Sequence, residues 1–244
     1  KYKVYGELIN TYGYNLEPGS KELTALNYYT NEEITIPLDP TQTPGENAQR
    51  YFAKYNKQKR TFEALTELIQ ETADDIQYLE SISIALDIAL SEADLAQIKE
   101  ELMQSGYIRR KHTKKKVKLT SKPMHYISSD GYDMYVGKNN LQNEELTFSF
   151  ANGNDWWFHA KGAPGSHVIV KSGGDELPDC TFEEAGRLAA YYSKNRGADK
   201  VEIDYIQKKH VKKPNGAKPG FVVYYTNYSL VIDSDISNIK NVQD

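Results

Sequence analysis

The stretch that most constrains the fold runs from Glu46 to Ser105 and contains neither proline nor glycine. These two residues are the usual breakers of helices, so their absence favours long, uninterrupted helix. Within the stretch, mostly apolar side chains recur at alternating steps of three and four, the heptad spacing of a coiled coil. The positions on this seam are Tyr55, Gln58, Phe62, Leu65, Ile69, Thr72, Ile76, Leu79, Ser83, Leu86 and Leu90. The pattern predicts a helical arm.

Capping signals mark the ends of the predicted helices. Thr43 is followed by a proline and stands three residues before Glu46, which is a typical helix start. We expect a long helix over about 44–90, spanning about 65–70 Å. A second cap at Ser91 predicts a shorter helix over residues 92–105.

An amphipathic helix cannot cover its own seam, so the arm needs a partner. Residues 1–13 have helical spacing at Val4 and Leu8 and are expected to be the end of such an antiparallel partner helix. Self-association of two chains through the seam is a second expectation. Residues 22–38 predict a small β-hairpin. We assign residues 1–108 to a coiled-coil arm that carries this hairpin.

Charge is distributed unevenly along the chain. The net charge of −4 divides into −9 for residues 1–108, +8 for residues 109–122 and −3 for residues 123–244. A basic run of this kind is either a solvated linker or a strip that binds phosphates. We interpret it as a basic linker whose candidate RNA-binding residues are Arg109, Arg110, Lys111, Lys114, Lys115 and Lys116.

Several classes of protein are disfavoured by composition. Cys180 is the only cysteine, which excludes an internal disulfide and a cysteine zinc cluster and fits a reducing, cytoplasmic origin. No run of 18 apolar residues occurs, so no membrane span is expected. The chain starts at Lys1 without a signal-peptide pattern, and we expect it to begin inside a longer protein.

From Pro123 onward the pattern changes to short strands, so the predicted fold class is α+β. We expect a compact domain over residues 123–244, with a mixed or antiparallel sheet. Thr181 and Glu184 form a capping pattern for a helix that runs to Gly197. The segments with strand pattern are residues 124–127, 134–136, 156–160, 166–170, 201–206, 221–225 and 230–232.

Two of these strands enclose a turn that concentrates polar side chains. Glycine and proline at residues 162–165 predict the turn. The turn brings together Trp157, His159, Lys161, Ser166 and His167 as candidate RNA-binding residues, because phosphates and 2′-hydroxyls are the usual targets of shape-based RNA recognition. For His159 the alternative is a strand histidine that is hydrogen-bonded within the sheet, and for the aromatic residues of the strand the alternative is packing in the core.

The same turn does not support catalysis. His159 and His167 have no third and fourth ligand in a metal-binding motif, so no metal and no cofactor are expected. The serine lacks the Gly-x-Ser-x-Gly elbow of a serine hydrolase. We therefore expect no enzymatic activity. A second basic segment, residues 208–220, contains no acidic residue and adds as candidates Lys208, Lys209, Lys212, Lys213 and Lys218.

The second half of the chain resembles the NFACT-R domain of the NFACT family, a proposed RNA-binding module. The motifs are Gly137-Lys138-Asn139-Asn140, Asp155-x-Trp157-Phe158-His159-Ala160, Pro164-Gly165-Ser166-His167-Val168, Lys212-Lys213-Pro214 and Gly216 with Lys218-Pro219-Gly220. Upstream, Asn47-Ala48-Gln49-Arg50-Tyr51-Phe52 with Lys54-Tyr55 resembles the start of the family's second coiled-coil helix, and Ile36-Pro37-Leu38-Asp39-Pro40 resembles the preceding strand. The resemblance does not extend to the family's N-terminal NFACT-N domain or helix-hairpin-helix.

This resemblance implies the C-terminal part of a cytoplasmic ribosome-quality-control factor. Such factors bind obstructed large ribosomal subunits and tRNA, and they support C-terminal alanine tailing of the stalled peptide. The family is also known for fibronectin and fibrinogen binding. The alternative is therefore a matrix-binding fragment of a streptococcal-type surface adhesin, displayed by a non-classical route. Nothing in the sequence resembles the strand-donating repeats of dedicated fibronectin binders.

Overall fold

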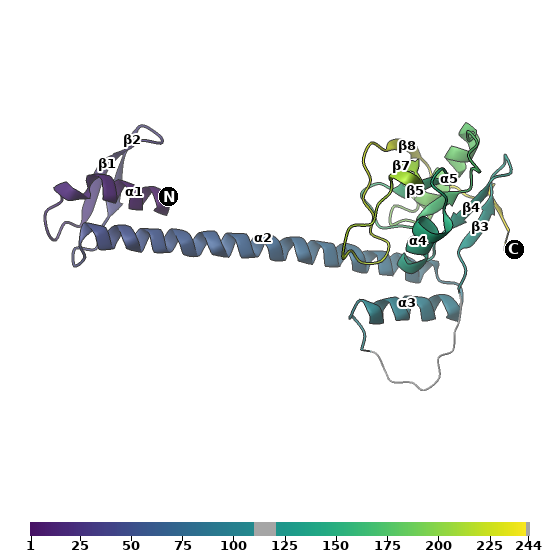
Figure 1. Cartoon of the computed structure of the whole chain (residues 1–244), viewed down its shortest axis with the longest axis horizontal. Coiled ribbons are helices and arrows are strands. Elements are labelled where there is room, and N and C mark those ends of the chain that lie inside the picture. The colour runs from purple at the N-terminus through teal and green to yellow at the C-terminus, as the bar shows by residue number, and fades with distance from the viewer. Residues whose placement is uncertain (110–120, 243–244) are drawn as a thin grey trace. The chain divides into compact units, whose positions relative to one another are not determined.

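The computed structural model describes residues 1–109 and 121–242 (Figure 1). They fall into two compact units, residues 1–74 and residues 75–244. The long helix α2 (Pro44–Ile88) contributes to both units. Its presence ahead of a compact domain with an antiparallel sheet confirms the predicted fold class. The division that we predicted at the basic segment 109–122 stays a prediction.

The first unit is a small α/β cluster. It contains helix α1 (Tyr2–Tyr12), the 3₁₀ turn η1 (Gly13–Asn15), strands β1 (Glu22–Asn27) and β2 (Glu32–Pro37), and the start of α2. The two strands pair antiparallel. Their inward side chains join α1 and α2 in one core made of Tyr5, Leu8, Ile9, Leu23, Ala25, Ile36, Ala48 and Tyr51.

Helix α1 runs antiparallel to the first turns of α2. The Tyr2 ring stacks on that of Tyr51 at 5.9 Å, and at the other end of α1 a Cβ on Gly13 would lie 3.0 Å from Pro44. Gly6 permits the close approach between them, because a Cβ there would lie 2.8 Å from the Phe52 ring. The antiparallel orientation of these two helices is the one that we expected for residues 1–13.

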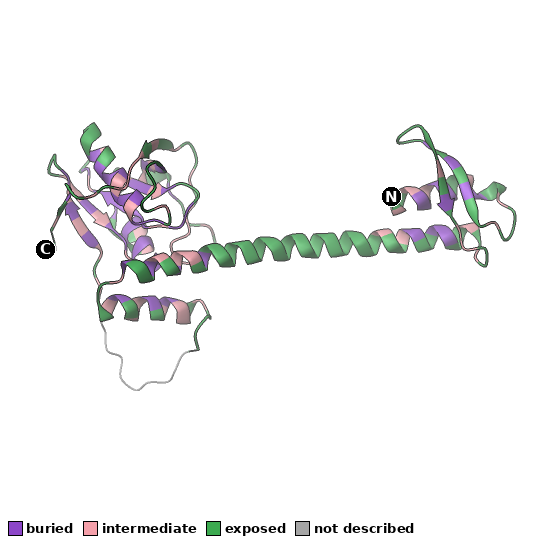
Figure 2. Ribbon diagram, turned by 180° about the vertical axis from the view of Figure 1, so that it is seen from behind, coloured by how far each residue is buried: buried purple, intermediate pink, exposed green. Residues whose placement is uncertain are grey.

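The middle of α2 is exposed. Phe62, Leu65 and Ile69 are 72%, 50% and 68% exposed, and Figure 2 shows the exposed colour along this part of the helix. In the described part of the chain nothing covers these seam positions. A coiled-coil partner for the seam, whether upstream chain or a second copy, therefore stays a prediction.

Both predicted caps of the helical region are formed. Glu46 Oε2 accepts bonds from the Thr43 backbone N–H at 2.7 Å and from its hydroxyl at 2.8 Å. The second helix, α3 (Glu92–Gln104), begins with a capping box between Ser91 and Asp94. Within the second unit, α3 packs on the end of α2 through a buried cluster of Tyr78, Ile82, Ala85 and Ile98.

The second unit is built on a seven-stranded antiparallel sheet with the order β8-β7-β5-β6-β4-β3-β9. The strands are β3 (Met124–Ile127), β4 (Asp133–Val136), β5 (Trp156–Ala160), β6 (Val168–Val170), β7 (Val201–Gln207), β8 (Tyr228–Ile232) and β9 (Lys240–Asn241). The connections contain helix α4 (Asn140–Glu145), the π turn η2 (Leu146–Phe150), helix α5 (Asp179–Tyr191) and the 3₁₀ turn η3 (Lys208–His210).

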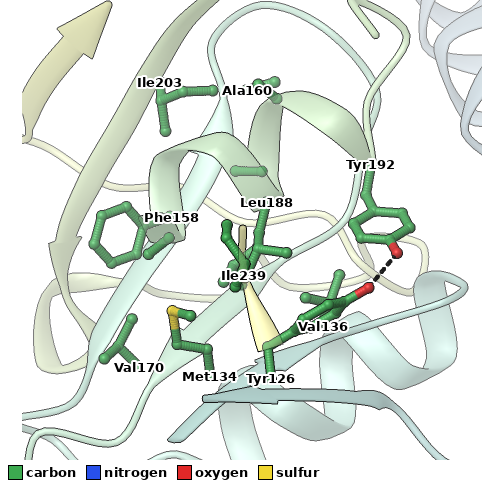
Figure 3. Packing of buried hydrophobic residues seen from close by; sticks show 14 of the residues in the cluster. Tyr126, Met134, Val136, Phe158, Ala160, Val170, Leu188, Tyr192, Ile203 and Ile239 are labelled. Carbon is green, nitrogen blue, oxygen red and sulfur yellow. Dashed lines mark hydrogen bonds between the residues drawn. The ribbon is translucent and has the colours of Figure 1, made fainter. Parts of the chain in front are cut away.

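Helix α5 covers one face of this sheet. Figure 3 shows Phe158, Leu188 and Ile203 in the shared core, and the hydroxyl groups of Tyr126 and Tyr192 bond at 2.6 Å. Strand side chains alternate between faces, so the neighbour of Phe158, Trp157, belongs to a second cluster on the opposite face. That second face carries the candidate site.

Several details of the α+β domain differ from the sequence-based expectation. Helix α5 ends at Tyr191 rather than at Gly197. Helix α5 begins at Asp179 rather than at Thr181, because the Thr181 hydroxyl bonds Ser128 at 3.0 Å and Asp130 at 2.8 Å instead of capping. The segment 221–225 is not a strand of the sheet. Its Val223 forms a single bridge with Lys212, so this segment closes the lysine-rich loop on itself.

Candidate nucleic-acid interface

The predicted turn between two strands is present. Strand β5 lies inside the sheet, with β6 on one side and β7 on the other, and the turn joins β5 to β6. Gly162 adopts a φ of +62°, a conformation that suits glycine. Gly165 lies against the end of α5, where a Cβ would be 2.8 Å from the Ser193 Cβ. Small residues therefore let the turn pack closely on the helix.

The polar residues of this turn are placed very differently from one another. Lys161 is half exposed and forms an ion pair with Glu202, whose hydrogen bond raises the pKa of the lysine. Ser166 is only 2% exposed, and its backbone N–H donates to the Tyr192 carbonyl at 2.8 Å. His167 is equally buried. Of these three, only Lys161 stands at the surface, and its charge already has a partner.

Trp157, His159 and His167 form one aromatic cluster. The Trp157 ring is fully buried and lies 5.6 Å from the His159 ring, stacked, and 5.1 Å from the His167 ring, edge-on. The two imidazoles are 5.4 Å apart. His159, for which the alternative was a strand histidine, lies on β5 and is half-buried. Trp157 is packed in the core, and His167 is buried just before β6.

Burial keeps both imidazoles neutral at physiological pH. Desolvation lowers the pKa of His159 to about 4, against weaker opposing effects of the Gly165 backbone and Asp204. Desolvation also lowers the pKa of His167 well below its usual value, and the neighbouring imidazole adds to this effect. His167 Nδ1 shares a 2.8 Å hydrogen bond with Thr147 Oγ1. The cluster is polar but uncharged.

A cavity of about 180 Å³ lies in front of this cluster; we call it the turn cavity. Its walls come from the end of α2 with α4, from the β5–β6 turn, and from the segment after Gly220. The side chains that shape it include Gln77, Asn143, His159, His167, Phe221 and Tyr224. Asn143 fixes the back of the cavity, since its Oδ1 accepts the His167 backbone N–H at 3.0 Å.

The loop lysines divide into two groups. Lys213 pairs with Glu144 at 2.7 Å, and Lys218 pairs with Asp75 while donating to the Tyr107 hydroxyl at 3.0 Å. Lys209 and Lys212 are exposed, and Lys208 lies over the Phe148 ring at 5.8 Å. Within the residues that the structure describes, no carboxylate pairs with Lys208, Lys209 or Lys212. These three ammonium groups are free to meet an anion.

The first basic segment is mostly beyond the described residues. Arg109 is exposed. Arg110, Lys111, Lys114, Lys115 and Lys116 lie outside the residues described, and their role stays a prediction.

Sequence reasoning missed several residues that complete the site. Asn143 and Thr147 hold His167, and the Tyr224 hydroxyl donates to Asp204 at 2.9 Å. The only available signal was the group of amide residues that follows Gly137, because a buried amide needs partners. Among described residues no group of three or more metal-binding side chains occurs. The helices described include none with the length and apolarity needed to cross a bilayer.

The second unit is thus an α+β module. It carries a loop with three lysines that no described carboxylate pairs with, and an adjoining cavity lined by uncharged side chains. Two family models match the chain: "NFACT N-terminal and middle domains" over residues 1–121, and "NFACT protein RNA binding domain" over residues 122–225. The chain belongs to the NFACT family, which confirms the resemblance seen in its motifs.

Relatives extend over the whole chain. The Rqc2 homolog RqcH of Streptococcus pneumoniae serotype 2 is 43% identical over 244 residues, covering 100% of this chain and 44% of the relative. The Rqc2 homolog RqcH of Bacillus subtilis is 41% identical, covering 98% of this chain and 42% of the relative. The chain thus spans less than half the length of these curated relatives.

A solved structure is also similar. It is the C-terminal part of the fibronectin/fibrinogen-binding protein from Streptococcus suis, with a TM-score of 0.73 and 38% identity. The match covers 98% of this chain and 86% of that one.

Proposed function

We propose that this chain is the RNA-binding and ribosome-contacting part of a ribosome-quality-control factor. In this proposal it acts in the cytoplasm on obstructed large ribosomal subunits and tRNA, and it supports C-terminal alanine tailing without being an enzyme itself. Residues 109–122 serve as a basic linker and residues 123–244 as the RNA-binding domain. The match of residues 122–225 to an RNA-binding domain and the relatives' name support this proposal.

The observation that carries the proposal is the group of unpaired lysines Lys208, Lys209 and Lys212. An ammonium group that is not held by a carboxylate is free to neutralise a phosphate, and the released counterions contribute affinity for any RNA sequence. Lys213 and Lys218 already have carboxylate partners, so a phosphate must compete for them. We therefore expect the three unpaired lysines to contribute most of the loop's affinity.

Fluorescence anisotropy with labelled tRNA, and with a large-subunit rRNA fragment, tests this proposal. The triple variant Lys208→Ala, Lys209→Ala, Lys212→Ala should bind at least tenfold more weakly at low salt. Its plot of log affinity against log salt should be shallower by about 2 to 3, since each phosphate contact contributes about 0.7–0.9. Equal affinity and equal salt slope for variant and wild type would refute the proposal.

The matched control removes the same charge elsewhere. Lys57, Lys99 and Lys200 are exposed and lie on other elements. Substituting these three by alanine should change the slope of log affinity against log salt by less than the value for one phosphate contact, about 0.7–0.9. Co-sedimentation with purified large ribosomal subunits then tests the ribosomal part of the proposal, and the loop variant should stay in the supernatant.

A second candidate function is binding to fibronectin or fibrinogen. It is favoured by the similarity to the Streptococcus suis protein, whose description names that activity. Surface plasmon resonance at physiological salt separates the two. Saturable binding that survives the loop-lysine variant supports the matrix function, whereas weak binding that modest salt abolishes is charge attraction alone.

A further inference from the structure

We propose that the turn cavity holds one unstacked RNA base, and that the cavity recognises the base by neutral polar groups and by stacking. This inference rests on the proposed RNA-binding function. It assigns to the cavity a ligand class different from that of the lysine loop, namely a planar, uncharged heterocycle rather than a phosphate.

The walls exclude an anion as the occupant. No lysine, arginine, aspartate or glutamate is among the described residues that line the cavity. The two imidazoles on its wall, His159 and His167, are neutral for the reasons given above. Placing a phosphate there would remove its water without offering a countercharge, and burial of an unpaired charge is costly. A nucleobase carries no charge, so it loses less hydration free energy than a phosphate when it enters the cavity.

The same walls offer hydrogen-bonding groups of both kinds. Gln77 is an exposed residue that lines the cavity and carries both an amide donor and an amide acceptor. Asn143 Nδ2 makes only a long bond of 3.4 Å to the Gly165 carbonyl. Trp157 does not line the cavity, but its ring stacks on the lining residue His159, and its Nε1 is a buried donor with no acceptor among described atoms. A base edge carries donors and acceptors that match such groups.

Aromatic rings complete the fit. Phe221 and Tyr224 line the cavity together with His159, and the Tyr224 ring is held 5.0 Å from the ring of Trp157. Single-stranded RNA is commonly recognised by bases that leave the stack and lie on aromatic side chains. The volume of about 180 Å³ is sufficient for one heterocycle.

The lysine loop and the cavity share one backbone segment. Val222 and Tyr224 line the cavity, and between them Val223 pairs with Lys212. The segment therefore presents one row of side chains to the cavity, while its bridge partner carries an unpaired ammonium group. A nucleotide whose base enters the cavity has its phosphate outside, next to this loop.

The test compares oligonucleotides that differ only in their bases. The probes are the four tetramers of a single ribonucleotide (A, C, G and U) and a tetramer of abasic ribose phosphate with the same charge. We expect at least one base-containing tetramer to bind tenfold or more tightly than the abasic one at equal salt. The variant Gln77→Trp fills the mouth of the cavity and should abolish this difference.

Gln58→Trp is the matched control, because Gln58 is an exposed residue of the same helix that does not line the cavity. It should retain the tenfold preference. As a direct readout, titration with the free ribonucleosides should shift the indole N–H signal of Trp157 in an NMR spectrum. The indole of Trp156, on the opposite face of the strand, serves as the internal reference.

The outcomes separate the two proposals. Equal affinity for abasic and base-containing tetramers overturns the base cavity. If tRNA binding still depends on salt and on the loop lysines, the proposed RNA-binding function stands. A base preference that persists in Gln77→Trp also overturns it. Absence of binding to every RNA overturns both proposals. A preference lost only in Gln77→Trp supports the base cavity.

Discussion

Acidification from pH 7 to pH 5 should destabilise the sheet domain through the imidazoles of His159, which is half-buried, and His167, which is buried. The folded-state pKa of His159 is about 4, whereas an exposed histidine has a pKa near 6.5. Because the folded state resists protonation, this contribution to stability is complete above pH 6.5 and is lost as the pH falls toward 4. For His159 alone, the free energy of unfolding should fall by about 2 kcal/mol between pH 7 and pH 5.

Desolvation shifts the pKa of His167 in the same direction, so protonation of His167 adds to this loss of stability. Carboxylates with ordinary pKa values near 4 remain largely ionised throughout the window from pH 7 to pH 5. Burial raises the pKa of Glu101, and protonation of this residue acts in the opposite direction. Below pH 5 carboxylates contribute as well. Asp94, for example, has a folded-state pKa of about 2, because its hydrogen bonds outweigh its desolvation, and its contribution is lost as the pH falls from about 4 toward 2.

Urea denaturation followed by tryptophan fluorescence measures this effect selectively. Both tryptophans, Trp156 and Trp157, lie on β5, so their emission reports unfolding of the sheet domain. The variant His159→Gln should show a weaker pH dependence than wild type, whereas His210→Gln, at an exposed position, should show the wild-type dependence. A free energy of unfolding that is equal at the two pH values, or higher at pH 5, would refute the assignment of neutral, desolvated imidazoles.

Three substitutions test the packing that supports the site. Gly165→Ala should destabilise the sheet domain by about 1–3 kcal/mol, because its Cβ would clash with Ser193; a urea midpoint equal to wild type contradicts this. Phe158→Ala removes a fully buried ring and should reduce the free energy of unfolding by about 3–5 kcal/mol, and a loss below about 1 kcal/mol in the same assay would mean that the core repacks. Tyr126→Phe removes the hydroxyl that bonds Tyr192 and should lower the free energy of unfolding by about 1 kcal/mol, observed as a lower melting temperature by circular dichroism; an unchanged or higher melting temperature argues against a net contribution from this bond.

The helical part of the fold could be predicted because its determinants are local. The absence of proline and glycine after Glu46 and the capping pairs at Thr43 and Ser91 act within a few residues of chain. The helix start at Thr181 was wrong for the opposite reason. Its hydroxyl bonds Ser128 and Asp130, about fifty positions away in the sequence, and no local rule anticipates that competition.

The candidate site was predicted as a set of residue types but not as an arrangement. The sequence by itself identified the turn around Gly162, the aromatic and histidine positions of β5 and the lysine-rich loop, because turn residues, strand alternation and charge runs are visible along the chain. Only the tertiary structure decided which charges remain free. Lys218 meets Asp75 and Lys213 meets Glu144, pairs that lie 143 and 69 positions apart. Ion pairing and desolvation depend on distance through space, and the folded chain alone sets those distances.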